Sequence, residues 1–180
     1  MNFPILSSLI LLPSIGALFI LLSKTSENSN FQSSKYVALF VSFINFFISI
    51  YLWYIFDPTV FDFQFVENRL WLQGFINYKV GIDGISILFL ILTTLITALC
   101  IILVNQNIKI KLKEFLIAIL LMESLMIGVF CSLDLIIFYL FFEGGLIPMF
   151  LIIGIWGGSR RVYSAFKFFL FTLLGSVLML

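Results

Sequence analysis

The sequence consists of long apolar runs separated by shorter polar connections. A helix needs roughly 20 apolar residues to cross a bilayer core about 30 Å thick. Five runs clearly reach this length and a sixth just reaches it; they cover about residues 3–22, 36–56, 85–104, 115–133, 135–156 and 162–180. Each run predicts a transmembrane helix, because backbone groups in lipid must bond within the protein and the runs lack the alternation of barrel strands.

The runs together predict an all-α membrane protein with about six transmembrane helices, forming a single domain over residues 1–180. The long connection over residues 57–84 has a different pattern. Its "FDFQFVE" segment alternates apolar and polar residues, and Gly74 follows at a place suited to a turn. This connection is therefore expected to form a small β-hairpin.

Basic residues are distributed unequally between the two sides of the predicted bundle. Two of them, Arg69 and Lys79, fall on the side of the hairpin. Eight fall on the opposite side: Lys24, Lys35, Lys109, Lys111, Lys113, Arg160, Arg161 and Lys167. Since Lys and Arg accumulate in cytoplasmic or matrix loops, both termini are expected on the outer side of the membrane.

The composition agrees with a membrane protein and narrows the chemistry. Of the residues, 62% are hydrophobic and 11% are charged, whereas about a quarter of the residues in soluble domains are charged. The net charge of +1 gives no reason to expect a nucleic-acid partner. The chain has no His and two Cys, Cys100 and Cys131, which excludes the usual zinc spacings and a disulfide framework.

One glutamate, Glu143, lies near the middle of the fifth run. Asp134 marks the outer end of this run, so a rise of about 1.5 Å per residue places Glu143 about 13–14 Å deep. The pair Gly144–Gly145 and the following Pro148 weaken the helix beside it, which would let water or backbone oxygens approach the carboxyl group.

A second glutamate, Glu123, has a similar depth in the fourth run. It lies ten residues from Lys113, or about 15 Å at the same rise. A carboxylate at the bilayer centre is costly, so it is usually paired, hydrated or protonated. Two interpretations follow for each glutamate: a proton-relay group that changes its protonation, or a polar group bonded to a Ser, Tyr or backbone group in a helix interface.

Lys167 is the third candidate, about 9 Å inside the inner edge if the helix starts near Arg161. Its side chain could extend back to the interface, or it could pair electrostatically with Glu143 if the two helices pack together. In "VGIDGIS", Asp83 lies just before the third run and is expected to cap the start of that helix. No phosphate loop, nucleophile pair or cofactor fingerprint occurs in the sequence.

Several of these segments resemble a known family. "FYLFFEGGLIPMFLIIGIWG", the following "SRRVYSAFKFFLFTLLGSVLML" and the earlier "VGIDGIS" are closely similar to subunit 4 of respiratory NADH:ubiquinone oxidoreductase, complex I. "DFQFVE" and "IDGISILFLILTT" look more like the mitochondrial form. The resemblance covers nearly the whole chain, and its "FFE..LIPM" part is highly specific to the antiporter-like subunits.

The resemblance implies a membrane-arm subunit that contributes to proton translocation coupled to electron transfer from NADH to ubiquinone. Glu143 occupies the position of the family's essential proton-channel glutamate. Glu123 looks like a glutamate that some relatives carry on the preceding helix and is a candidate relay, while Lys167 is a candidate charge partner. The resemblance implies no cofactor in this chain; NADH, FMN, iron–sulfur clusters and ubiquinone are expected in other parts of the assembled enzyme.

The implied partners are the other membrane-arm subunits and membrane lipids, with no nucleic acid. The implied location is the mitochondrial inner membrane, with both termini on the intermembrane-space side; a bacterial plasma membrane is the alternative. The family architecture is much longer and has two inverted repeats, so we expect either a second chain with the remaining helices or a truncated product. A multisubunit Na⁺/H⁺ antiporter subunit and a non-pumping assembly fragment remain alternative functions.

Overall fold

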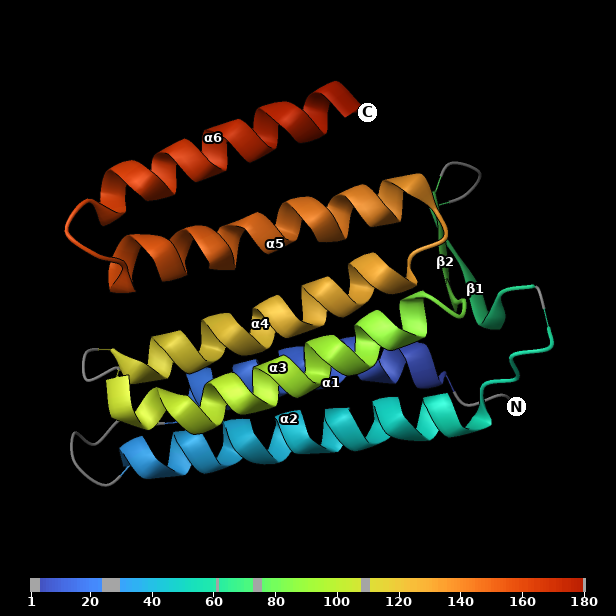
Figure 1. Ribbon diagram of the computed structural model, residues 1–180, viewed down its shortest axis with the longest axis horizontal. Helices are drawn as coiled ribbons and strands as arrows, with labels where there is room; N and C mark the ends of the chain where they lie inside the picture. Colours follow the sequence, from blue (N-terminus) through green and yellow to red (C-terminus); the bar gives the residue numbers. More distant parts are fainter. Residues whose placement is uncertain (1–3, 24–29, 61, 73–75, 108–110, 180) are drawn as a thin grey trace.

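The computed structural model describes residues 4–23, 30–60, 62–72, 76–107 and 111–179. In these residues the chain forms six helices and one two-stranded sheet (Figure 1). In chain order the elements are α1 (Ile5–Leu22), α2 (Asn30–Ile55), β1 (Gln64–Leu72), β2 (Ile76–Ile82), α3 (Ser86–Asn107), α4 (Leu112–Cys131), α5 (Leu135–Trp156) and α6 (Arg161–Met179). The predicted helices and the predicted hairpin are confirmed, although the turn at Gly74 lies outside the described residues.

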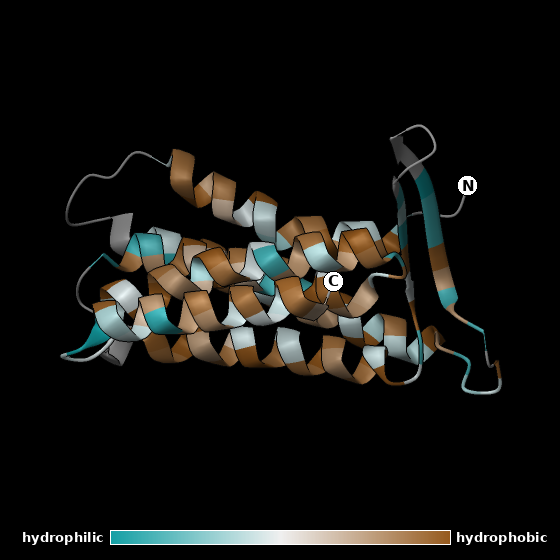
Figure 2. Ribbon diagram, turned by 90° about the horizontal axis from the view of Figure 1, so that it is seen from above, coloured by the Kyte–Doolittle hydropathy of each residue, from teal (hydrophilic) through white to brown (hydrophobic). Residues whose placement is uncertain are grey.

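All six helices are long and apolar enough to span a membrane. Figure 2 shows that most positions along the helices are apolar, with hydrophilic positions at the ends of the bundle and a few near its middle. Large side chains such as Phe40, Phe47 and Phe171 are exposed on the outer surface of the bundle. An apolar exterior of this extent would be unstable in water and suits contact with lipid. The chain is a multi-pass membrane protein.

Several helix boundaries differ by a few residues from those expected from the apolar runs, and two of these differences have a clear physical reason. α2 begins at Asn30, six residues earlier, because a helix continues into polar sequence once it has left the hydrocarbon. α4 ends at Cys131, two residues earlier. There Ser132 forms a bridge with Val80 of β2, and the Leu133 N–H donates to the Lys79 carbonyl at 3.0 Å. This pairing with the hairpin competes with further helix.

The hairpin closes one end of the bundle (Figure 1). β1 and β2 pair antiparallel, with Glu67 opposite Val80 and Arg69 opposite Tyr78. Val80 and Ile82 are fully buried in a cluster with residues of α1, α2, α3 and α4. Burying two β-branched side chains against four helices anchors the hairpin to the helix ends.

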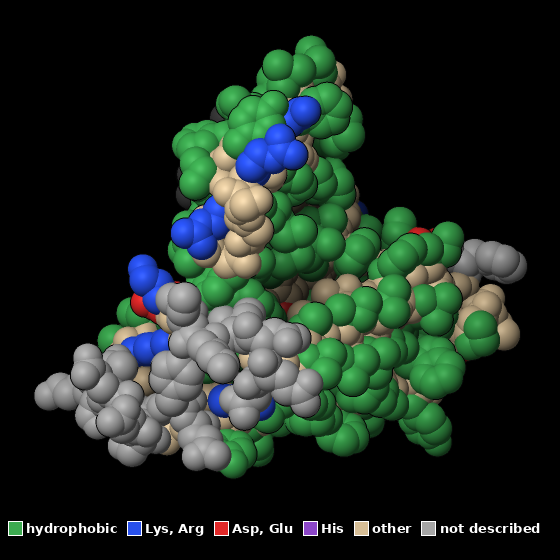
Figure 3. Space-filling model, turned by 60° about the vertical axis from the view of Figure 1, so that its left-hand side comes forward, with side chains coloured by type: hydrophobic (Ala, Val, Ile, Leu, Met, Phe, Trp, Pro, Cys, Tyr) green, Lys and Arg blue, Asp and Glu red, His purple; other side chains and the backbone are tan. Residues whose placement is uncertain are grey.

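The basic residues lie mostly at the end of the bundle opposite the hairpin. Lys35 lies in the second turn of α2, Lys111 precedes α4, Arg160 precedes α6 and Arg161 begins it. Figure 3 shows Lys and Arg side chains gathered at this end. The predicted grouping of these residues on one side is present in the structure, while Lys24 and Lys109 lie outside the described residues.

α4 is the central helix and α6 is peripheral. α4 packs against α1, α2, α3 and α5, as well as β2. α6 packs against α5 at the edge of the bundle (Figure 1). α4 approaches α5 closely at Gly128, where a Cβ atom would lie 2.6–2.8 Å from three atoms of the Phe141 ring. Only a residue without a side chain allows this contact.

Candidate functional site

Glu143 lies on the third turn of α5, at the interface with α6. The helix starts as predicted, because Asp134 accepts hydrogen bonds from the N–H groups of Ile136 and Ile137, at 2.9 and 3.4 Å. The Ser176 hydroxyl of α6 donates to Glu143 Oε1 at 2.7 Å. Tyr139, one turn earlier on α5, interacts with both Glu143 and Ser176.

The surroundings of Glu143 are partly buried and hydroxyl-rich. Ser176 has an exposed fraction of 5%, whereas Glu143 itself is half-buried. α5 continues through Pro148, which cannot donate to the Gly144 carbonyl and so leaves that oxygen without its usual helical partner. Serine and tyrosine hydroxyls can both donate and accept, so they can keep a hydrogen bond to Glu143 in either protonation state.

Glu123 lies in a different environment, fully buried between α2, α3 and α4. Its exposed fraction is 0%, and Asn45 Nδ2 of α2 donates to its Oε1 at 2.9 Å. Thr97 of α3 is near the carboxyl group. The Thr97 hydroxyl, however, donates to the backbone carbonyls of Thr93 and Thr94, and Glu123 Oε2 has no hydrogen-bond partner.

The two glutamates have nearly the same depth but separate partners. Gly128 faces Phe141 and Gly144 faces Leu125, which sets the antiparallel alignment of α4 and α5. In this alignment Glu143 is level with a position about three residues from Glu123, or about 4.5 Å along the axis. The expected similarity in depth agrees with this geometry. Because their partners lie on different helices, the two carboxyl groups form two sites.

Lys167 is not brought to Glu143. It is exposed on α6, with Nζ 5.9 Å from the centre of the Tyr163 ring. It precedes Ser176 by nine residues, so it lies about 13–14 Å nearer the basic end of the bundle along α6. The position agrees with a side chain that extends to the interface, and the pairing with Glu143 is not formed.

Two partners were missed by the sequence reasoning. Asn45 could have been found from its spacing, since Ser42, Asn45 and Ser49 recur at three- and four-residue intervals in an otherwise apolar run and all three are buried. Ser176 gave no comparable signal, because one serine in a transmembrane run is common.

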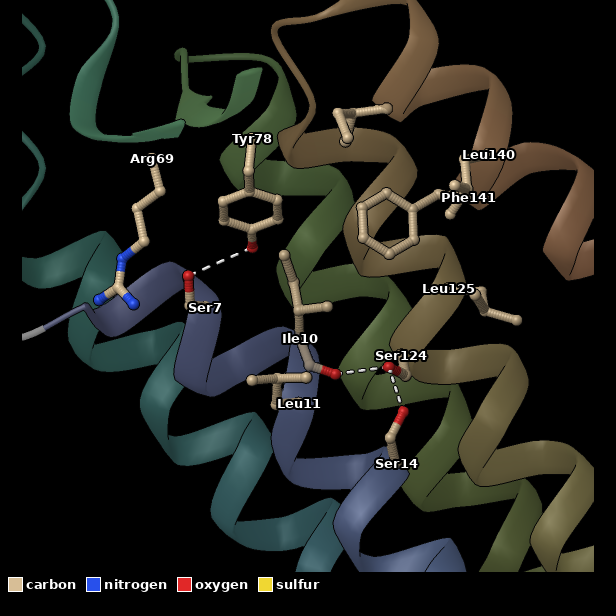
Figure 4. Close-up of a pocket in the computed structure, with 11 residues that line it drawn as sticks. Ser7, Ile10, Leu11, Ser14, Arg69, Tyr78, Ser124, Leu125, Leu140 and Phe141 are labelled. Atoms are coloured by element: carbon tan, nitrogen blue, oxygen red, sulfur yellow. Dashed lines mark hydrogen bonds between the residues drawn. The ribbon is translucent and has the colours of Figure 1, made fainter. Parts of the chain in front are cut away.

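A cavity of about 510 Å³ lies between α1, the hairpin, α4 and α5 (Figure 4). Its polar lining comes from Ser7, Ser14, Arg69, Tyr78 and Ser124. The Ser14 hydroxyl donates to the Ser124 hydroxyl at 2.7 Å, and the Ser7 and Tyr78 hydroxyls are 3.2 Å apart. Burial raises the pKa of Tyr78 above its usual range. This cavity contains neither glutamate.

The side chains that the structure describes offer no group of three His, Cys, Asp or Glu residues able to hold a metal ion. Cys100 is exposed and Cys131 is buried, and both are free. The described groups around Glu143 and Glu123 are carboxyl, amide and hydroxyl groups.

Comparison with known proteins places these features in a family context. The family "NADH:quinone oxidoreductase/Mrp antiporter, TM" matches residues 132–180, which include α5, Glu143 and Ser176. A solved archaeal respiratory membrane complex, the membrane-bound sulfane sulfur reductase, matches with a TM-score of 0.75 and 16% identity over 95% of this chain and 26% of that chain. The structural likeness shows that this chain shares its fold with a part of that chain.

Curated relatives are more similar in sequence. "NADH-quinone oxidoreductase subunit M" of Rhodobacter capsulatus is 51% identical over 98% of this chain and 34% of the relative. "NADH-ubiquinone oxidoreductase chain 4" is 48% identical in Marchantia polymorpha and 47% in Arabidopsis thaliana, over 97% of this chain and 35% of each relative. The chain thus spans about a third of the length of the relatives it matches, and its resemblance to subunit 4 of complex I is confirmed.

Proposed function

We propose that the chain is the N-terminal part of a membrane-arm subunit in a proton-pumping NADH:quinone oxidoreductase, where Glu143 takes up and releases a translocated proton. The observation that carries this proposal is the placement of Glu143 within a membrane span, hydrogen bonded to Ser176 across the α5–α6 interface. An ionisable group inside a membrane span is costly and is retained mainly for function.

The chemistry assigned to Glu143 is reversible protonation. The carboxylate accepts the proton, and the carboxylic acid later gives it to the next group of the path. Ser176 and Tyr139 orient the carboxyl group and can bond to both forms. Electron transfer from NADH to ubiquinone, with FMN and iron–sulfur clusters, is assigned to other subunits of the complex.

Other membrane-arm subunits are the proposed partners, together with lipids around the apolar exterior. We also propose that a second chain carries the remaining helices of the family architecture and packs near α6. Relatives occur in a bacterium and in plants. We assign this chain to the mitochondrial inner membrane, with the basic end of the bundle toward the matrix and both termini on the other side.

Replacing Glu143 by Gln in the assembled enzyme tests the proposal. The amide keeps a hydrogen-bond acceptor for Ser176 but cannot exchange a proton. NADH-driven proton uptake into sealed vesicles should fall at least tenfold, because positioned proton-transfer groups contribute factors of roughly 10² to 10⁴. Coupled NADH oxidation should fall with it.

Glu114→Gln is the matched control, since Glu114 is exposed at the start of α4. Normal pumping by the Glu143 variant would contradict the assignment. Glu123→Gln should have a milder effect than Glu143→Gln, and an equal loss would give Glu123 the same importance. Sodium-dependent transport without NADH oxidation would instead favour the antiporter function, which the matched family also includes.

A further inference from the structure

α2 turns a polar face toward the interior of the bundle. Ser42, Asn45 and Ser49 are buried on this face, which packs against α3 and α4. Ser49 and Thr94 of α3 share a hydrogen bond of 2.9 Å, and the Ser42 hydroxyl donates to the Leu39 carbonyl at 3.0 Å. Both serine hydroxyls on this face thus have hydrogen-bond partners, and Asn45 is the remaining polar residue of the face.

Asn45 and Glu123 leave two buried oxygens without partners. One bond joins the residues, from Asn45 Nδ2 to Glu123 Oε1. The other two atoms of the same groups, Asn45 Oδ1 and Glu123 Oε2, are buried and have no hydrogen bond. Both are acceptors when the carboxyl group is ionised, so neither can satisfy the other in that state. Buried polar atoms without partners are rare and require an explanation.

No cation of the described residues faces this pair. The described parts of α1 and α3 carry no charged side chain. On α2, Lys35 lies ten residues from Asn45 and donates to the Ile102 carbonyl. On α4, Lys113 and Glu114 are at the basic end, about nine or ten residues from Glu123, which is roughly 14–15 Å.

The other titratable groups on the elements packed against α4 also point elsewhere. Cys100 of α3 and the α2 residues Tyr36, Tyr51 and Tyr54 are exposed on the outer surface. On α5, Glu143 and Tyr139 face Ser176 of α6. On β2, Tyr78 faces Ser7 of α1 and Lys79 is exposed. An ionised Glu123 would therefore be a buried charge with one amide bond and no counter-charge, which is strongly unfavourable.

We propose that Glu123 and Asn45 form an acid–amide pair that holds one proton in the interior of the bundle. With a proton on Oε2, the carboxyl group donates to Asn45 Oδ1 while its Oε1 accepts from Asn45 Nδ2. This single proton satisfies both orphaned oxygens. Asn45 is the positioning residue of the pair, and Glu123 changes between acid and carboxylate when the proton leaves.

The pair is a second protonatable site, independent of Glu143. The Ser49–Thr94 hydroxyls lie one turn along α2 toward the hairpin end, and Ser42 lies about one turn toward the basic end. Together with Thr97 of α3, which is near the carboxyl group, these hydroxyls are polar groups that could exchange a proton with the pair. The inference deepens the proposed function but does not depend on Glu143, so the two can fail separately.

Infrared spectroscopy of the complex in lipid vesicles at neutral pH tests this state directly, without a measurement of activity. The carbonyl-stretch band of one protonated carboxyl group should disappear in Glu123→Gln. It should move to higher frequency in Asn45→Ala, because the carboxyl group loses its amide partner. It should be unchanged in Ser42→Ala, which removes a neighbouring hydroxyl of α2, and in Glu143→Gln.

Loss of a carboxylate band in Glu123→Gln would overturn the proposal, since Glu123 would then be ionised and bridged by water. No change in either region on that substitution would also overturn it. Glu123→Gln should assemble normally, because a Gln amide can form both bonds with Asn45. This variant keeps the test decisive even if Asn45→Ala does not assemble.

Discussion

The first turn of α1 receives its capping carboxylate from a residue that is distant in sequence. Pro4, at the N-cap, has no side chain that can accept a hydrogen bond. Glu67 of β1 accepts instead from the Leu6 N–H at 2.9 Å, from the Ser7 N–H, and from the Ser7 hydroxyl. Anionic groups near a helix N-terminus are stabilising. The Glu67 carboxylate of the hairpin therefore stabilises α1, in addition to the apolar packing of Val80 and Ile82 against it.

Replacing Glu67 by Ala should lower stability by about 1–2 kcal/mol, because the free N–H groups of α1 lose their acceptor. Thermal unfolding of the complex in lipid measures the change. Asp62→Ala serves as the control, since Asp62 is an exposed carboxylate of the same connection. Equal melting curves for the two variants would show that Glu67 does not act as a cap.

Asp83 caps the start of α3 in a similar way, but it is close in sequence to the helix that it caps. It accepts from the Ser86 N–H at 2.7 Å, and its own N–H donates to the Ser86 hydroxyl at 2.8 Å, which confirms the predicted cap. The hydrogen bonds from Ser86 lower the pKa of Asp83 below its usual 3.8. Because the folded-state pKa is the lower one, the stabilisation is complete above 3.8 and is lost as the pH falls through the folded value.

Asp83→Asn should therefore flatten the acid dependence of stability below pH 3.8 and leave its shape above that pH unchanged. Tryptophan fluorescence during unfolding at a series of pH values measures this dependence. An unchanged acid slope in the Asn variant would show that other carboxyl groups cause it.

At the scale of elements, the packing of α4 on α5 depends on Gly128. A Cβ there would overlap the Phe141 ring, with three contacts below 3.0 Å. Gly128→Ala should thus destabilise the bundle by roughly 1–3 kcal/mol, in the range of overpacked cores. Gly145→Ala is the matched control, because a Cβ at Gly145 meets nothing within 4 Å and alanine favours helix.

Thermal unfolding of both variants in lipid compares these effects. Adding Phe141→Leu to Gly128→Ala should recover part of the loss, because a smaller and more adaptable side chain then faces the new methyl group. No recovery would place the strain elsewhere.

The helices were predictable from the sequence because a membrane-spanning helix needs a minimum number of apolar residues. The apolar runs predicted all six helices, and alternation predicted the hairpin. The early end of α4 was not predictable, because it depends on the pairing of Ser132 with Val80 across 52 residues of sequence. Depth along an axis follows from residue counting, and the similar heights of Glu123 and Glu143 were obtained in this way.

The directions in which the two glutamates point could not be obtained by counting. Rotation about a helix axis is set by the neighbours, and one sequence does not say which helices are neighbours. For this reason Asn45 and Ser176 were missed as partners, and the pairing of Lys167 with Glu143 stayed open until the arrangement of α5 and α6 was known.

For the molecule as a whole, the position of each helix separates the two carboxyl groups into an inner and an outer site. Glu123 is fully buried and belongs to the central helix, which packs against four other helices and β2. Glu143 belongs to α5, and its hydroxyl partner Ser176 belongs to peripheral α6.

Because α6 is peripheral, the environment of Glu143 depends on the molecules that contact α6. A helix held mainly by one neighbour can tilt or slide at little cost, and any such movement stretches the bond between Ser176 and Glu143. A protein or lipid that binds to α6 and shifts it would thereby change the hydration of the Glu143 carboxyl group without touching it. The hydration of Glu123, which is fully buried, would not change. The bundle thus contains one acid, Glu123, that is shielded from its surroundings, and another, Glu143, that responds to movement of α6.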